Sequence, residues 1–268
     1  MDNTPRALLV DMTRCIGCRA CVAACKEAHD LPGDESDTVL SATAYTAMVD
    51  KGDLHVRKLC MHCVTPSCAS VCPVSALRKT AAGPVVYESS RCIGCRYCML
   101  ACPFSVPRYE WHQAIPSVRK CDLCVERAAR GEIPACAAAC PVEATVAGTR
   151  PDLLAEAHRR LAEAPGSYFP HVFGESELGG TSVLFLSPVS FASLGFPQGL
   201  GEQPLPDLTW QALERVPGIV VLGGAALLAV HWITHRREEV AAADAAHSMT
   251  FRNPPAGKAE TEDEYGKE

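Results

Sequence analysis

Features that would give this chain a reaction of its own are missing from its 268 residues. There is no glycine-rich nucleotide-binding loop, no flavin fingerprint and no group of residues typical of acid–base catalysis. Cationic residues are not in excess either: the net charge is −6, so no basic surface favours nucleic acid as a partner. These absences argue against a self-contained nucleotide-dependent enzyme and against a nucleic-acid-binding protein.

Cysteine, by contrast, is abundant. The sixteen cysteines fall into four groups of four, and the first and third groups have the x2-x2-x3 spacing of a bacterial ferredoxin. Thiolates at this spacing wrap one face of a 4Fe–4S cluster, and the fourth cysteine points toward a neighbouring cluster. At four ligands per cluster, the sixteen cysteines predict four 4Fe–4S clusters with no thiol left over. The predicted iron ligands are Cys15, Cys18, Cys21 and Cys25; Cys60, Cys63, Cys68 and Cys72; Cys92, Cys95, Cys98 and Cys102; and Cys121, Cys124, Cys136 and Cys140.

Two other uses of cysteine fit this sequence less well. Disulfide frameworks also have even cysteine counts, but they belong to small secreted domains and this chain is longer. Structural zinc also uses CxxC pairs, but it usually takes its cysteines as two separated pairs. Three groups end in Cys-Pro, at Cys72, Cys102 and Cys140, and this ending is typical of ferredoxins.

The groups form an internal repeat, because residues 15–19 and residues 92–96 both read Cys-Ile-Gly-Cys-Arg. The glycine allows a tight loop whose backbone N–H groups point at sulfur. Apolar runs near the groups predict strands, and the residues after the ligand loops predict short helices. The predicted strands are 7–10 and 84–87, and the predicted helices are 20–28 and 97–101.

This repeat predicts an α+β fold with two ferredoxin-like dicluster modules in one domain, residues 1–150. Spacing leaves open which groups exchange their fourth cysteines. Adjacent exchange would pair group one with group two, whereas a nested arrangement would pair one with four and two with three.

Cations near the ligands would matter because a cluster with four thiolates is anionic. A nearby positive charge lowers the charging cost and raises the reduction potential. Seven cations lie within a few residues of a predicted ligand, and we expect only some of them to face a cluster. They are Arg14, Arg19, Lys58, Arg91, Arg96, Arg119 and Lys120.

The sequence changes character after residue 150. Residues 151–164 predict an amphipathic packing helix, with a proline in its first turn and an apolar face. A glycine- and proline-rich stretch follows, with one predicted strand at 182–186. We expect the segment 151–212 to consist of this helix and an extended arm that lies over other surfaces.

Residues 216–234 form an uncharged, mostly apolar run that is just long enough to span a membrane. Trp210 and Trp232 lie near its ends, where interfacial aromatic residues belong. We therefore predict one transmembrane anchor helix at 213–235, in contact with membrane lipid. A buried helix of a soluble protein is the alternative. The polar tail, 236–268, is expected to be disordered and cytoplasmic.

The charges beside this run predict its orientation. Arg236 and Arg237 follow it directly and only Arg215 precedes it closely, so the positive-inside rule places the C-terminus in the cytoplasm and the cluster domain in the periplasm. Residues 1–11 contain neither a secretory signal nor a twin-arginine pair. Because a cluster domain must cross the inner membrane folded, we expect a partner to carry the export signal. A cytoplasmic protein with a tail anchor is the alternative.

Three segments carry a family resemblance. Residues 60–77, CMHCVTPSCASVCPVSAL, and residues 92–103, CIGCRYCMLACP, resemble the iron–sulfur β subunits of respiratory complexes. That family includes the electron-transfer subunits of dimethyl sulfoxide reductase, membrane formate dehydrogenase and hydrogenase-2-type nickel–iron enzymes. Residues 168–184, YFPHVFGESELGGTSVL, resemble the segment between clusters and anchor in the last two. The resemblance covers most of residues 7–235.

The resemblance implies nested ligation, and no cysteine is replaced in the way that gives some relatives a 3Fe–4S cluster. In the first module, one cluster would take Cys15, Cys18, Cys21 and Cys140, and its neighbour Cys121, Cys124, Cys136 and Cys25. In the second module, one cluster would take Cys60, Cys63, Cys68 and Cys102, and its neighbour Cys92, Cys95, Cys98 and Cys72.

The resemblance also implies an electron-transfer subunit that is not an enzyme on its own. Electrons would pass through the four clusters between a catalytic subunit, with a molybdenum or tungsten pterin or a nickel–iron centre, and a quinone-reactive membrane subunit, either a cytochrome b or a haem-free protein. A terminal molybdenum reductase working in the opposite direction is the alternative. Two other functions fit the sequence less well. A cluster enzyme would leave one iron without a cysteine, whereas all four groups here are complete. A redox sensor would need an effector or DNA-binding module, which the tail does not offer.

Two histidines allow two interpretations each. His231 lies in the apolar run, where an ionisable residue is a functional candidate for contact with haem or quinone, but it can also snorkel to the interface. His62 lies between Cys60 and Cys63, where it would either hydrogen-bond to the cluster or simply pack the loop.

Overall fold

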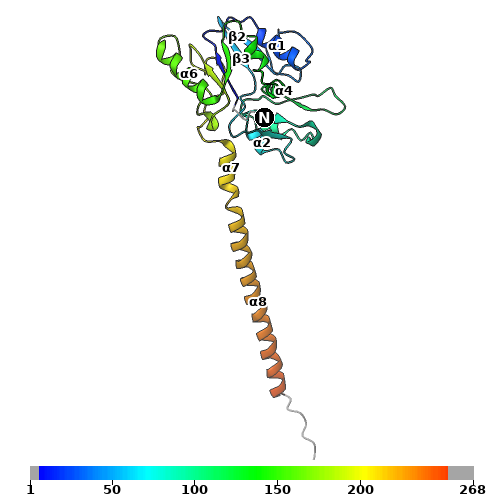
Figure 1. Cartoon of the computed structure of the whole chain (residues 1–268). Coiled ribbons are helices and arrows are strands. Elements are labelled where there is room, and N and C mark those ends of the chain that lie inside the picture. The colour runs from blue at the N-terminus through cyan, green and yellow to red at the C-terminus, as the bar shows by residue number, and fades with distance from the viewer. Residues whose placement is uncertain (1–5, 253–268) are drawn as a thin grey trace, which may run out of the picture. The chain divides into compact units, whose positions relative to one another are not determined.

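The computed structural model describes the backbone of residues 6–252 and the side chains of residues 6–248 (Figure 1). The chain divides into two units, Met1–Thr209 and Trp210–Glu268, which are described one at a time. In chain order the elements are β1 (Ala7–Asp11), α1 (Ala20–Ala28), β2 (Ala47–Lys51), β3 (Leu54–Lys58), α2 (Ser67–Ser70), β4 (Leu77–Lys79), β5 (Val85–Tyr87), η1 (Ser89–Arg91), α3 (Tyr97–Leu100), β6 (Arg108–Tyr109), β7 (Val118–Arg119), α4 (Val125–Ala129), α5 (Ala135–Ala138), β8 (Thr145–Gly148), α6 (Arg150–Glu163), η2 (Glu177–Gly179), β9 (Val183–Leu186), α7 (Leu205–Leu213) and α8 (Val216–Arg252).

Strand β1 is the centre of a three-stranded sheet with the order β8–β1–β9. β8 is antiparallel to β1 and β9 is parallel to it, so Leu9 lies opposite both Val146 and Leu184. Every residue of β1 is buried, as expected for a strand with a core on each face. Leu8 belongs to the core shared with the cysteine loops, whereas Leu9 belongs to a second core with Leu153 of α6.

The segment after α6 differs from the extended arm that the sequence predicts. Its strand, β9, is fully buried and pairs with β1, so this segment completes the core of the first unit instead of covering it. The rings of Phe173, Phe191 and Phe196 pack together, with centroids 4.8–5.2 Å apart. The physical reason is that the apolar side chains of β9 point to both faces of the sheet, and both faces are cores.

Helix α6 lies one residue before the predicted range and has the expected packing role. Thr149 caps its N-terminus by accepting a hydrogen bond from the Asp152 N–H at 3.3 Å, and a proline occupies the first turn. Leu153 and Ala157 are buried against the sheet.

Short elements hold the cysteine loops. Three two-stranded antiparallel sheets, β2–β3, β4–β5 and β6–β7, surround them. Helix α1 has the bounds that the sequence predicts, and α3 ends one residue before its predicted end. Helices α2, α3 and α5 contain four residues each. Elements of this size are marginal in isolation, so this region depends on cross-links between its loops.

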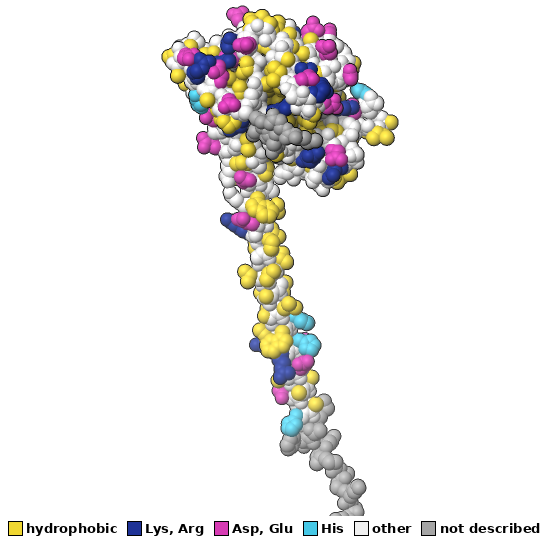
Figure 2. All heavy atoms as spheres, in the orientation of Figure 1, with side chains coloured by type: hydrophobic (Ala, Val, Ile, Leu, Met, Phe, Trp, Pro, Cys, Tyr) yellow, Lys and Arg dark blue, Asp and Glu magenta, His cyan; other side chains and the backbone are white. Residues whose placement is uncertain are grey.

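The second unit contains α8, whose first half is covered by apolar side chains (Figure 2). Among the described residues, one helical stretch, Leu205–Ser248, is long and apolar enough to cross a membrane. Its apolar window has a mean hydropathy of 2.0, and none of that window is buried. Lack of burial does not fit the alternative of a core helix, for which the apolar side chains would be covered by protein.

The helix continues beyond the predicted end of the anchor. Residues 236–252 are helical where the sequence predicted disorder, and residues 253–268 of the predicted tail lie outside the described range. The reason is local: five of the six residues 241–246 are alanine, the strongest helix former. Arg236 and Glu239 add a pair at 3.5 Å within one turn.

Candidate iron–sulfur cluster sites

All four cysteine groups begin with the same backbone turn. The residue two positions after the first cysteine has a left-handed backbone in every group, which turns the loop back on itself. These residues are Gly17 (φ 69°), His62 (φ 48°), Gly94 (φ 71°) and Leu123 (φ 60°). The turn aims backbone N–H groups at sulfur: Gly94 donates to Cys92 Sγ at 3.4 Å, and Leu123 donates to Cys121 Sγ at 3.5 Å.

The three Cys-Pro endings repeat a second turn. The third residue after each of these cysteines is left-handed: Ser75 (φ 52°), Ser105 (φ 50°) and Glu143 (φ 50°). The amides that follow donate to the cysteine sulfurs at 3.2–3.5 Å, from Ala76 to Cys72, from Val106 to Cys102 and from Thr145 to Cys140. Hydrogen bonds of this kind favour thiolate and raise the potential of a bound cluster.

Two cavities are each surrounded by four cysteines. The first is lined by Cys15, Cys18, Cys21 and Cys140, which come from the two ends of the 1–150 region. The second is lined by Cys72, Cys92, Cys95 and Cys98. In both cases three cysteines belong to one group and the fourth comes from another group.

The remaining eight cysteines also lie in mutual proximity. Burial raises the pKa of the Cys63 thiol, and the neighbouring thiols of Cys60, Cys102 and Cys68 raise it further. Burial likewise raises the pKa of Cys121, and the neighbouring Cys25 raises it further. Burial also raises the pKa of Cys124, and the neighbouring Cys136 raises it further. Two of the four nested sets therefore each line one cavity. The ligand sets themselves stay a prediction.

The chemistry of these residues fits 4Fe–4S clusters. All sixteen cysteines are free thiols, and tetrahedral sets of soft sulfur ligands suit iron–sulfur clusters or zinc. One ring nitrogen of His62 lacks a hydrogen-bond partner. Its Nδ1 accepts a hydrogen bond from the Val85 N–H at 2.9 Å, whereas its buried Nε2 has no partner among the described residues. A buried N–H needs an acceptor, and the sulfur of a cluster beside Cys60 and Cys63 would provide one.

Few of the seven cations identified near the ligands face the interior. Most are paired or stacked at the surface: Arg19 with Asp50 at 2.8 Å, Arg91 with Glu88 at 2.9 Å, Arg119 with Glu110 at 2.7 Å, Arg96 over Trp111 and Lys58 over Phe196. Arg14 is exposed, and Lys120 alone of the seven is buried. Arg57 is also buried, but proximity in sequence did not single it out, because Lys58 is one residue closer to Cys60.

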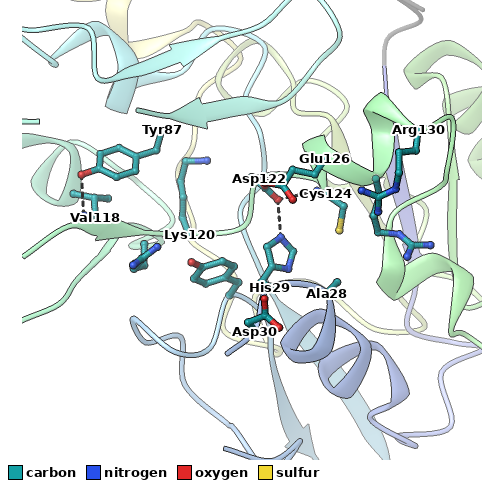
Figure 3. Close-up of a pocket in the computed structure, with 13 residues that line it drawn as sticks. Ala28, His29, Asp30, Tyr87, Val118, Lys120, Asp122, Cys124, Glu126 and Arg130 are labelled. Carbon is teal, nitrogen blue, oxygen red and sulfur yellow. Dashed lines mark hydrogen bonds and ion pairs between the residues drawn. The ribbon is translucent and has the colours of Figure 1, made fainter. Parts of the chain in front are cut away.

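His29 is a further residue that the sequence did not indicate. Figure 3 shows its ring directed at Asp122, and His29 Nε2 lies 3.0 Å from Asp122 Oδ1. Burial opposes the charged form of His29, but hydrogen bonds to Asp122 and Cys25 outweigh it and raise the pKa of His29 to about 11. Asp122 also accepts a hydrogen bond from the Cys124 N–H at 2.8 Å. The pair therefore fixes the loop that carries a predicted ligand.

Comparison with known proteins gives the class first. Two regions, residues 14–76 and residues 53–150, match families described as 4Fe-4S dicluster domains. The protein is therefore a 4Fe–4S dicluster protein, and its α+β fold with a following long apolar helix agrees with the prediction. Binding of 4Fe–4S clusters is confirmed at this level.

Named relatives then give the family. The hydrogenase-2 operon protein HybA of Escherichia coli O157:H7 is 37% identical over 237 residues, with 71% of this chain and 72% of the relative covered. The iron–sulfur subunit of nitrate-inducible formate dehydrogenase of Escherichia coli (strain K12) is 37% identical over 199 residues, with 67% of each chain covered. The formate dehydrogenase iron–sulfur subunit of Haemophilus influenzae is 32% identical over 252 residues, with 85% of this chain and 80% of the relative covered. The chain belongs to this family of iron–sulfur subunits of oxidoreductase complexes, which confirms that it is an electron-transfer subunit and not a catalytic one.

Proposed function

We propose that this chain carries electrons through four 4Fe–4S clusters in a membrane-bound respiratory oxidoreductase. The electrons pass between a catalytic subunit, either a formate dehydrogenase or a nickel–iron hydrogenase, and a quinone-reactive membrane subunit. The observation that carries the proposal is that all sixteen free cysteines lie within one unit, where two cavities are each lined by four of them, three from one group and the fourth from another. The formate dehydrogenase and hydrogenase-2 relatives support the two candidate complexes.

The residues of this chain would hold and tune the clusters and perform no acid–base step. Each set of four cysteines binds one cluster, which supplies a site for one electron at a time. The proposed sets are Cys15, Cys18, Cys21 and Cys140; Cys25, Cys121, Cys124 and Cys136; Cys60, Cys63, Cys68 and Cys102; and Cys72, Cys92, Cys95 and Cys98. Backbone N–H groups directed at sulfur, burial and nearby charges set the potential of each site.

The membrane helix would anchor the complex in the inner membrane with the cluster domain in the periplasm. Arg236 and Arg237 after the apolar run, against Arg215 before it, support a cytoplasmic C-terminus. Protease added to intact spheroplasts should digest the cluster domain. A domain that stays protected until the cells are lysed would contradict this orientation.

Anaerobic purification of the complex tests the proposal directly. We expect about sixteen irons per chain, four iron–sulfur signals in electron paramagnetic resonance (EPR) after reduction, and either molybdenum or tungsten, or nickel, in the co-purifying catalytic subunit. Reduction of the clusters by formate or hydrogen would identify the donor. Reduction by quinol alone would favour the alternative, a terminal molybdenum reductase. Far fewer irons would contradict the four-cluster assignment.

A further inference from the structure

Arg57 is an arginine in the interior of the first unit, on strand β3 and only 2% exposed. Its Nε donates to Thr46 Oγ1 at 3.0 Å, and its Nη1 donates to Thr145 Oγ1 at 3.2 Å. Both acceptors are neutral hydroxyl groups. Within residues 6–248, no ion pair joins Arg57 to a carboxylate. The contrast is Arg160, the other buried arginine, which is paired with Asp11.

Two cavities border Arg57, and no acidic side chain lines either of them. One is the cavity surrounded by Cys15, Cys18, Cys21 and Cys140. The other is a cavity of about 350 Å³ with mostly apolar walls, where Lys58 and Arg108 are the other charged lining residues. Arg57 is therefore enclosed on both sides by surroundings that offer no carboxylate counter-charge.

A buried guanidinium is costly unless something of opposite charge accompanies it, because an arginine side chain stays protonated. The groups around Arg57 that can carry negative charge are sulfurs. Arg57 and Cys21 line the same cavity, and the sulfurs of Cys136, Cys21 and Cys25 interact electrostatically with the guanidinium. Cys21 and Cys136 belong to two different proposed cluster sets.

We propose that Arg57 is a shared counter-ion of two neighbouring clusters, the one held by the Cys21 set and the one held by the Cys136 set, and that its fixed positive charge raises the reduction potential of both. This inference rests on the proposed function, because it needs clusters in these two sets. Reduction adds one electron to a cluster, so a nearby cation stabilises the reduced form more than the oxidised form.

The shared position has a consequence for electron transfer. A positive charge beside only one of the two clusters would raise the reduction potential of that cluster alone. The potentials of the two neighbouring clusters would then differ more. Arg57 lies beside sulfurs of both sets, so it raises both potentials together and limits the gap between them. It is a positioning residue that acts through the clusters.

The first pair of variants separates charge from packing at position 57. In the full-length chain purified anaerobically with its complex, Arg57→Met removes the charge and keeps much of the volume, whereas Arg57→Lys keeps the charge. Redox titration with dithionite, followed by EPR, is the readout. For Arg57→Met we expect the reduction equilibrium of two clusters to shift at least tenfold toward the oxidised form, about 59 mV for a one-electron couple. Arg57→Lys should shift it much less.

The second pair leaves Arg57 in place. Thr46→Asp puts a carboxylate where the Thr46 hydroxyl now accepts the Arg57 hydrogen bond, so the guanidinium becomes paired within the protein. We expect the same two potentials to fall as in Arg57→Met. Thr46→Asn, similar in size to aspartate but neutral, is the matched control and should leave the potentials near those of the parent protein.

The outcomes are distinguishable from failure of the proposed function. A parent protein without four clusters would contradict the proposed function. Unchanged potentials in Thr46→Asp at full iron content would overturn the role of Arg57, whatever happens to Arg57→Met. The role of Arg57 would also be supported if iron were lost only in Arg57→Met and Thr46→Asp and retained in full in Arg57→Lys and Thr46→Asn. Cluster retention would then follow the charge at position 57 and not the packing.

Discussion

Asp11 and Arg160 form a buried ion pair although 149 residues separate them, with Arg160 Nη1 at 2.9 Å from Asp11 Oδ2. Asp11 is fully buried at the end of β1, and Arg160 lies in the last turn of α6. The other carboxylate oxygen accepts the backbone N–H groups of Thr13 and Arg14 at 3.0 and 3.3 Å. The pair therefore ties α6 to the turn that leads into the first cysteine group.

Arg160→Met should destabilise the protein by about 3–5 kcal/mol, because it leaves the Asp11 carboxylate buried without its cation. The three remaining donors to Asp11, including the Tyr168 hydroxyl at 2.9 Å, place the expected value at the lower end. Anaerobic thermal unfolding, followed by loss of cluster absorbance, measures it. Arg159→Met is the control: Arg159 pairs with Glu156 and Glu163 at the surface, where solvent screens the charges, so its loss should change the stability far less. Equal effects of the two substitutions would contradict the role of burial.

Local structure in this protein could be predicted from the sequence, because it depends on neighbouring residues. The helix near residues 151–164 follows from its apolar face and a proline in the first turn, and the helix at residues 20–28 follows from its place directly after a ligand loop. The cysteine groups followed from spacing alone. The tail at residues 236–252 was wrongly predicted as disordered, because its polar character hid a run of strong helix formers.

Long-range structure could not be predicted in the same way. The pairing of β9 with β1 joins segments about 175 residues apart, and no local pattern encodes which strand is the neighbour. The burial of Arg57 depends on β3 pairing with β2 and on contact with Thr145, which is distant in sequence. Proximity in sequence to a cysteine therefore identified seven cations, which include Lys120 but not Arg57. Only tertiary packing distinguishes these two buried cations from those that are paired at the surface.

Serine substitutions can decide between nested and adjacent ligation. In the nested arrangement, Cys140→Ser and Cys18→Ser should alter the same EPR signal, whereas Cys25→Ser and Cys124→Ser should alter a second one. The reason is that each pair would ligate one cluster, and cysteine sulfur is the preferred iron ligand. If Cys25→Ser instead altered the signal of the Cys60 group and spared that of Cys124, the exchange would be between adjacent groups.

Lys120→Met should lower the potential of a cluster in the second module. Lys120 is buried, and among residues 6–248 its ammonium donates hydrogen bonds to main-chain oxygens alone, those of Val85 and Cys121. Burial raises the pKa of the Cys68 and Cys102 thiols, and Lys120 opposes that rise. Removing this charge should shift the reduction equilibrium toward the oxidised form by about tenfold, or 59 mV for one electron.

The matched control for Lys120 is its neighbour. Arg119 is 43% exposed at its side chain and pairs with Glu110 at 2.7 Å, so Arg119→Met removes a positive charge that is already compensated and in contact with water. Redox titration of both variants makes the comparison. A shift of similar size in Arg119→Met would mean that distance to the cysteines, and not burial, decides which cations tune the clusters.

Removal of iron should unfold the cysteine region and spare the long helix. The sheets β4–β5 and β6–β7 have strands of three and two residues, and helices α2, α3 and α5 have four residues, all too short to be stable without cross-links. Sixteen iron–thiolate bonds would be lost together, and metal binding of this kind is coupled to folding. Helix α8, with 37 residues, needs no such link in a detergent micelle.

Limited proteolysis after iron removal tests this prediction. After treatment with a chelator and an oxidant, the protease should cut within residues 60–140 and leave a fragment that contains α8. Chelator alone, which leaves the iron in place, should not expose these sites. Continued resistance of residues 60–140 after complete iron loss would show that the protein core, and not the metal, holds the cysteine loops in place.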